Sequence, residues 1–174
     1  KSWVAGLLAE GMHHAGYQIL LIDPEGDFRG LQTMSEFVAF TGNQRTLPAP
    51  AVVTTVLETV GVSVVLDLCD YPVSQRGQYV SDLLRSLRSL RERKFRPHWI
   101  LLEEAQHFLS PWADHHKAVM EALAPMLAGG GWTFVSYCPN QLGNPVLSTL
   151  HHCLLTRLSD ADAIQALRQQ FQLP

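Results

Sequence analysis

The residues of this chain that are best suited to catalysis or metal binding are two adjacent carboxylates, Glu103 and Glu104. They end an apolar run, residues 98–102, that is typical of a buried parallel strand. Since ligands of open α/β sheets bind at the carboxyl ends of strands, we expect this pair to face a site. Successive strand side chains point to opposite faces, so the two acids would do different work. Glu103 would hold a metal ion through water and Glu104 would activate an attacking water, whereas a solvated strand end is the simpler alternative.

A second candidate site lies at the start of the chain, where Lys1 and Ser2 precede a helical pattern. The two residues match the last letters of the phosphate loop G-x-x-x-x-G-K-[ST]. In such a loop the lysine contacts the β- and γ-phosphates, the hydroxyl binds Mg²⁺, and the helix N-terminus adds partial positive charge. Any chain can begin with these two letters, so the interpretation depends on the helix that follows and on the distant acidic strand end.

Alternating helical and strand-like patterns predict the elements that position these residues. Strands are expected at 18–22, 36–40, 63–69, 98–103, 132–137 and 152–157. Helices are expected at 4–15, 52–60, 80–90, 114–127 and after Ser159, which would form a capping box with Asp162. The first helix would bury one apolar face, made of Val4, Leu7, Leu8, Met12 and Ala15. The alternation predicts an α/β fold with three layers, in which helices cover both faces of a mostly parallel sheet.

Composition and charge restrict the class of protein. The 174 residues are predicted to form one domain, 1–174, and their 47% apolar and 17% charged content is typical of a soluble globular protein. A net charge of −3 gives no overall attraction to nucleic acid. We expect no membrane contact, because no apolar run has the length of a membrane span. Cys69 and Cys153 lie in apolar runs, which predicts buried free thiols and a reducing, cytoplasmic location.

One local basic patch could still contact DNA. It holds six of the chain's 13 basic residues, on and just after the helix expected at 80–90, and only Glu92 opposes it in the sequence. Its members are Arg85, Arg88, Arg91, Arg93, Lys94 and Arg96. Such a face can bind DNA phosphates or an acidic neighbouring subunit, and a solvated helix face is the alternative that we favour.

Three further acids follow the strand expected at 18–22, namely Asp23, Glu25 and Asp27. They could form the rim of a site, but Pro-Glu-Gly-Asp is ordinary turn chemistry, and a solvated turn is the interpretation that we favour.

Four segments together resemble the HerA/FtsK superfamily of P-loop ATPases, most closely its bacterial HerA-type members. They are Lys1-Ser2 and the segments 22–28, 63–68 and 96–105. The resemblance covers nearly the whole chain and is weakest over residues 29–60. It implies a RecA-like core that binds ATP and Mg²⁺, assembles into a homo-oligomeric ring, and pumps or processes DNA.

The resemblance also implies roles for individual residues. Lys1 would contact phosphate, Ser2 and Glu103 would hold Mg²⁺, and Glu104 would activate water. Arg157, at the end of the last expected strand, would lie near the nucleotide of its own or an adjacent subunit.

The chain departs from the family pattern in four places. The first strand and the glycine-rich part of the phosphate loop are absent from the sequence, and Glu103 replaces the usual Asp. Gln106 stands where the family often has His. Ser136-Tyr137-Cys138-Pro139 replaces the family's Thr-Gln-Arg-Pro, whose Gln contacts the γ-phosphate. Tyr137 or Gln141 could substitute for that contact, so the sequence supports nucleotide binding more strongly than hydrolysis.

Three functions follow from these observations. The leading hypothesis is an ATP-binding and ATP-hydrolysing core domain of HerA/FtsK type that acts on DNA. The first alternative is a nucleotide-binding regulatory switch with little or no hydrolysis. The second alternative is an α/β interaction module that binds no nucleotide.

Overall fold

A single parallel sheet forms the centre of the molecule. The computed structural model describes residues 1–41, 46–95 and 98–172, and in these residues five strands pair in the order β2-β3-β1-β4-β5. The strands are β1 Ile19–Asp23, β2 Phe37–Thr41, β3 Ser63–Asp67, β4 Trp99–Leu102 and β5 Trp132–Phe134. All neighbouring pairs are parallel. The predicted α/β class with its parallel sheet is confirmed.

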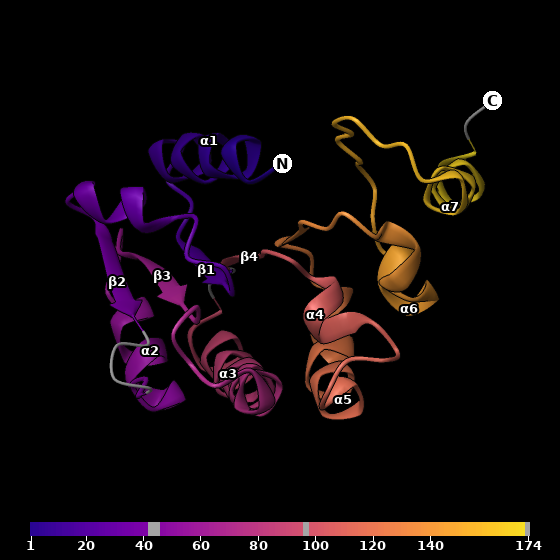
Figure 1. Ribbon diagram of the computed structural model, residues 1–174. Helices are drawn as coiled ribbons and strands as arrows, with labels where there is room; N and C mark the ends of the chain where they lie inside the picture. The colour runs from indigo at the N-terminus through magenta and orange to yellow at the C-terminus, as the bar shows by residue number, and fades with distance from the viewer. Residues whose placement is uncertain (42–45, 96–97, 173–174) are drawn as a thin grey trace.

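Helices cover both faces of this sheet, so the fold has three layers (Figure 1). The α-helices are α1 Ser2–His14, α2 Pro50–Leu57, α3 Val73–Lys94, α4 Gln106–Leu109, α5 His116–Leu127, α6 Asn144–Leu147 and α7 Ala161–Phe171. Short 3₁₀ helices, η1 Arg29–Thr33 and η3 Pro139–Gln141, complete the described elements. This arrangement is consistent with the RecA-like fold.

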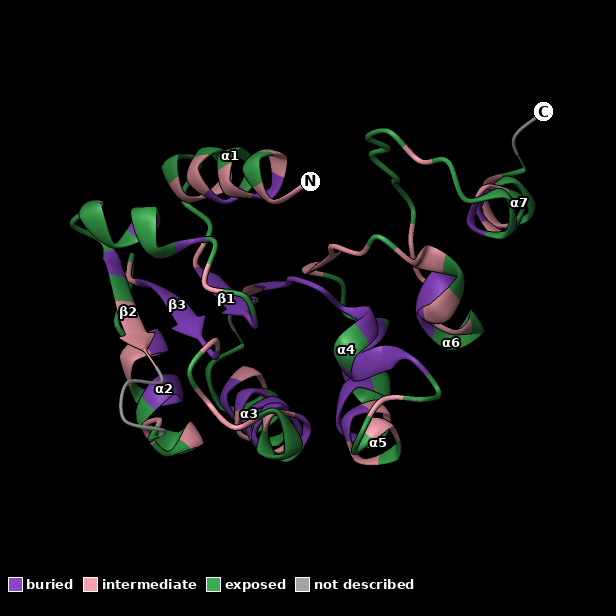
Figure 2. Ribbon diagram, viewed as in Figure 1, coloured by how far each residue is buried: buried purple, intermediate pink, exposed green. Residues whose placement is uncertain are grey.

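The strand β1 shows how one sheet separates two cores. Ile19 and Leu21 pack with the α1 side of the sheet, whereas Leu20 and Ile22 join the larger core on the other side. The alternation follows from the strand geometry, which sends successive side chains to opposite faces. Because every residue of β1 is buried, both sides of the sheet centre are covered (Figure 2).

The buried face of α1 differs from the predicted one. Ala5 and Ala9 are the buried residues of this helix, while Leu7 and Leu8 remain 47% and 42% exposed. Ala5 and Ala9 are four positions apart and therefore lie on one helical face. Their small side chains fit beneath the helix against β1 and Phe28, so the bulkier leucines face outward.

The strand expected at 152–157 is wrong. Residues 151–160 have no regular secondary structure, and Leu154 and Leu155 are 74% and 53% exposed. No described strand lies beside this segment to pair with its backbone, and without a partner an apolar run does not form a strand. The capping prediction is also off by one residue, because Asp160, rather than Ser159, caps α7 by accepting a hydrogen bond from Ala163 N at 2.7 Å.

The prediction that Cys69 and Cys153 are buried is wrong. Cys153 is exposed in the irregular segment, and Cys69 is half-buried because it follows β3 instead of lying within it. Both are free thiols, as is the half-buried Cys138. Separately, none of the helices in the described part of the chain is both long and apolar enough to cross a membrane.

The order of the strands defines where a ligand can enter. After β1 the chain crosses to β2 at one edge of the sheet, and after β4 it continues to β5 at the other edge. Such a reversal opens a crevice at the carboxyl ends of β1 and β4, where ligands of α/β sheets bind. Asp23 ends β1 and Glu103 follows β4, so both lie at this crevice.

Gly77 of α3 provides a test of the packing around this crevice. A Cβ atom at Gly77 would lie 2.7 Å from the backbone oxygen of Asp114, which is too close for a rigid contact. We expect Gly77→Ala to lower the free energy of unfolding by about 1–3 kcal/mol. Gly11→Ala in α1 is the matched control, since it meets no atom within 4 Å and should stabilise by about 0.5–1 kcal/mol. Urea unfolding measures both variants, and equal changes in their free energies of unfolding would contradict the close contact between Gly77 and Asp114.

Candidate functional site

The two ends of the predicted site meet in the structure. The Lys1 ammonium contacts the Glu104 carboxylate and lies 3.3 Å from Glu103 Oε1. Ser2 Oγ donates a hydrogen bond to the same Glu103 oxygen at 2.7 Å. Four of the predicted site residues therefore form one cluster, the Lys1–Glu103–Glu104 cluster with Ser2, at the carboxyl end of β4.

The two glutamates do not diverge as expected. Strand β4 ends at Leu102, and Glu104 adopts a left-handed backbone conformation with φ of 46°. A non-glycine residue in this region is uncommon, and here the turn brings the Glu104 carboxylate to the same ammonium that Glu103 contacts. The expected alternation does not hold, because both acids lie beyond the last strand residue.

Glu103 carries the most unusual electrostatic environment of the cluster. Its side chain is fully buried, and burial raises the pKa of its carboxyl although the bond from Ser2 and the charge of Lys1 act in the opposite direction. Its Oε1 atom is occupied, but its buried Oε2 atom has no hydrogen-bond partner among the described residues. An unpaired buried carboxylate oxygen is costly, so this atom has the capacity to accept a further partner.

The donor set at this point suits a magnesium ion. Mg²⁺ prefers oxygen ligands and is usually held by one or two protein groups together with water and substrate phosphates. The Ser2 hydroxyl and the Glu103 carboxylate supply such oxygens side by side. Within the described ranges, no group of three or more His, Cys, Asp or Glu is placed to hold a metal ion. Ser2 and Glu103 therefore fit a metal that is completed by phosphate and water.

Asp23 has a structural role that its sequence context does not reveal. Its carboxylate accepts hydrogen bonds from the backbone N–H groups of Glu25, Gly26 and Phe28 at 3.1, 2.8 and 2.9 Å. Burial raises the pKa of Asp23, against these bonds, which lower it. Glu25 and Asp27 are exposed, as a solvated turn requires, but Asp23 is completely buried and builds that turn.

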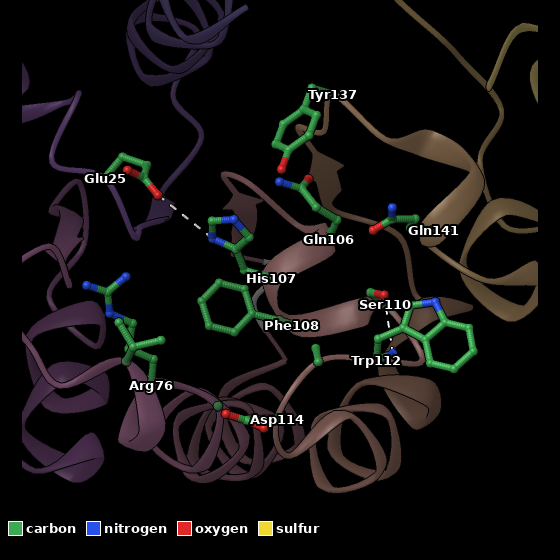
Figure 3. A pocket seen from close by; sticks show the side chains of 13 residues that line it. Glu25, Arg76, Gln106, His107, Phe108, Ser110, Trp112, Asp114, Tyr137 and Gln141 are labelled. Atoms are coloured by element: carbon green, nitrogen blue, oxygen red, sulfur yellow. Dashed lines mark hydrogen bonds and ion pairs between the residues drawn. The ribbon is translucent and has the colours of Figure 1, made fainter. Parts of the chain in front are cut away.

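Tyr137 lies close to the cluster, and Gln141 lines the same cavity as Tyr137. The Lys1 ammonium is 5.8 Å from the centre of the Tyr137 ring. Both residues line a cavity of about 450 Å³, together with Gln106 and His107. Figure 3 shows the Tyr137 and Gln106 side chains pointing toward one another, with Gln141 beside them. The structure thus brings the two predicted substitutes for the γ-phosphate contact to one cavity, and it places Tyr137 beside Lys1.

Gln106 and Ser136, which the sequence analysis named only as departures from the family pattern, are additional functional candidates. Gln106 is buried, and its Nε2 atom donates to Glu104 Oε2 at 2.5 Å. Ser136 Oγ donates to Gln106 Oε1 at 2.6 Å, and Cys138 N donates to Ser136 Oγ at 3.0 Å. A glutamine two residues after the acid pair is visible in the sequence, but its partner lies on another strand end and only the fold identifies it.

Arg157 is not part of the cluster. It is exposed in the irregular segment 151–160, and none of the contacts found among the described residues joins it to Lys1, Glu103 or Glu104. Its predicted position at a strand end fails with the strand itself. A role of Arg157 toward an adjacent subunit stays a prediction.

The predicted basic patch is largely paired with acids. Arg85 contacts Asp82 and Arg88 contacts Glu92, each at 2.8 Å. Glu58 accepts from both Arg93 and Lys94 at 3.2 and 3.3 Å. The sequence showed only Glu92 as an opposing acid, because Glu58 comes from the end of α2 and reaches this surface through the fold. Arg96 lies outside the described residues.

Arg91 is a packing residue. Its guanidinium donates to the His98 carbonyl oxygen and lies 5.4 Å from the centre of the Trp132 ring. Burial lowers the pKa of this group, as expected for a charge withdrawn from solvent. The prediction that Arg91 belongs to an exposed DNA-binding face is therefore wrong.

Comparison with known proteins does not assign the chain to a family. No protein-family model matches the chain, and no curated protein matches its sequence. The functional interpretation therefore depends on the geometry of the site and on the resemblance of the motifs.

Replacing Arg91 should separate packing from surface charge. We expect Arg91→Ala to lower the free energy of unfolding by about 1–3 kcal/mol, because the cation–π contact and the bond to His98 are both lost. Arg88→Ala removes only an exposed pair and should cost less than about 1 kcal/mol. Urea unfolding of both variants measures the difference, and a larger cost for Arg88→Ala would refute the packing role.

The raised pKa of Glu103 predicts a pH dependence of stability. The folded chain holds the carboxyl proton more tightly than the unfolded chain, so stability is lost as pH rises from about 4.5 through the folded pKa. The loss is about 1.4 kcal/mol for each pH unit over which the folded chain keeps this proton and the unfolded chain has released it. Glu103→Gln cannot ionise, so its stability relative to wild type should rise as pH increases from about 4.5 through the folded pKa of Glu103.

Chemical unfolding at several pH values measures this difference. Glu92→Gln is the control, because Glu92 is exposed on α3 and contacts Arg88. Parallel stability curves for wild type and Glu103→Gln would show that burial of Glu103 does not perturb its ionisation.

Proposed function

We propose that this chain is the ATP-binding and ATP-hydrolysing core of a HerA/FtsK-like ATPase. The observation that carries the proposal is the convergence of Lys1, Ser2, Glu103 and Glu104 at the carboxyl edge of the parallel sheet. A lysine and a hydroxyl at a helix start, facing two acids at a neighbouring strand end, match the parts of a phosphoryl-transfer site. The two acids follow β4, which pairs with β1, and ligands of α/β sheets bind at the carboxyl ends of such strands.

The proposed division of work follows from the contacts. Lys1 would exchange its carboxylate partners for the β- and γ-phosphates and place its charge on them. Ser2 and Glu103 would hold Mg²⁺, which supplies neutralisation of phosphate charge when bound. Glu104 would accept a hydrogen bond from the attacking water and orient it toward the phosphate. The Tyr137 ring beside Lys1 would contact the phosphate end of the nucleotide.

Two parts of the proposal rest on the resemblance. Assembly into a homo-oligomeric ring and action on DNA are expected from the family. The paired charges on α3 give DNA binding no additional support.

A regulatory switch is the second candidate, and one observation favours it. Tyr137 stands beside Lys1, where the resemblance expects a polar amide that contacts the γ-phosphate. A chain with this substitution could bind ATP and signal its presence without efficient hydrolysis.

Replacing Glu104 by Gln tests the hydrolytic proposal. In the full-length protein we expect Glu104→Gln to keep ATP binding but to lower turnover by about 10²–10⁴-fold, because an amide cannot accept the proton of the attacking water. Steady-state phosphate release and equilibrium binding of ATP measure the two properties. Glu92→Gln, the same change on the exposed face of α3, should alter neither.

The outcomes separate the three candidate functions. Unchanged turnover in Glu104→Gln would reject Glu104 as the general base. ATP binding by wild type without turnover would favour the switch, and no ATP binding would favour an interaction module.

A further inference from the structure

We propose that Gln106, anchored by Ser136, is the positioning residue that holds the Glu104 carboxylate for water activation. The inference rests on the proposed ATPase function and adds a residue to its machinery. It is carried by a chain of hydrogen bonds that joins the ends of β4 and β5.

The direction of these hydrogen bonds fixes the orientation of the Gln106 amide. The backbone N–H of Cys138 donates to Ser136 Oγ, and the Ser136 hydroxyl donates to Gln106 Oε1. An ionised carboxylate can only accept, so the NH₂ group of Gln106 is the end of the amide that faces Glu104. The amide oxygen is thereby occupied, and the amide NH₂ group points to Glu104 Oε2 at 2.5 Å. Every donor in this chain is directed toward the carboxylate, which suits its ionised, accepting form.

Burial makes this chain of bonds rigid and costly to break. Gln106 is 4% exposed and Glu104 is 9% exposed, and the adjacent Ala105 is fully buried. Hydrogen bonds in such surroundings are stronger than in water, and a lost partner leaves a buried polar atom unsatisfied. Gln106 also begins α4, so its backbone is held by a helical turn.

Gln106 is the anchor that remains when a nucleotide binds. In the structure the Glu104 carboxylate is held on one oxygen by Lys1 and on the other by Gln106. Under the proposed function Lys1 leaves Glu104 for the phosphates, and the described contacts then leave Gln106 to fix the left-handed Glu104 in place. A water-activating group must keep its orientation at that moment, since catalysis is sensitive to small misplacements.

Replacing Gln106 by Leu in the full-length protein tests the inference. Leu has a similar size but no donor, so we expect kcat for ATP hydrolysis to fall about 10–100-fold while the KM for ATP stays unchanged. Ser136→Ala should lower kcat less, because Gln106 keeps its bond to Glu104 but loses its anchor. The double variant should fall no further than Gln106→Leu alone, since both act through one chain of bonds. Gln75→Leu, an exposed glutamine of α3, is the matched control and should retain wild-type kcat.

The outcomes distinguish this inference from the function on which it rests. If the wild-type protein hydrolyses ATP and Gln106→Leu has the same kcat, the positioning role is overturned and the proposed ATPase function is retained. Additive losses in the double variant, or a parallel loss of ATP affinity, would also overturn it, since a general structural defect has that signature. Wild type without turnover would overturn both. If Gln106→Leu does not fold, Ser136→Ala decides the question, and a wild-type kcat in that variant would reject the role.

Discussion

The contact of one ammonium with two carboxylates is the interaction on which the site depends. The Lys1 side chain is 24% exposed, while those of Glu103 and Glu104 are 0% and 12% exposed. Charges withdrawn from water to this extent require partners, and loss of one partner leaves the other uncompensated. The same contact ties the start of α1 to the end of β4. The groups that we propose for phosphate binding and water activation are therefore held together by the demand for charge compensation.

Three neighbouring strands of the sheet end at buried carboxylates, and their different partners indicate different roles. Asp67 of β3 is held by Arg29 Nε at 2.6 Å and by the backbone N–H of Cys69 at 2.9 Å. Asp23 of β1 accepts three backbone N–H groups. Glu103 after β4 differs, because its Oε2 atom is buried without a hydrogen-bond partner among the described residues. The first two acids build turns, and the third retains capacity for a ligand.

The sequence predicts elements well where the local pattern agrees with the tertiary environment. The apolar run ending at Glu103 and the alternation of helices and strands identify the parallel sheet and the edge where Lys1 and Glu103 meet. Prediction fails where a distant partner decides the outcome. Residues 152–157 have a strand-like composition but no neighbouring strand among the described residues. The partners of Arg91 and Gln106 come from β4, β5 and the residues beside them, and they are known only from the fold.

Equilibrium binding of ATP to the full-length protein, with and without Mg²⁺, tests the central claim most directly. Titration calorimetry on wild type, Lys1→Ala and Ser2→Ala separates the phosphate contact from the metal contact. The proposed function predicts ATP binding that strengthens with Mg²⁺, is lost in Lys1→Ala, and loses its Mg²⁺ dependence in Ser2→Ala. Binding that is absent in wild type, or indifferent to both Mg²⁺ and Lys1, would contradict the assignment of this cluster as a nucleotide site.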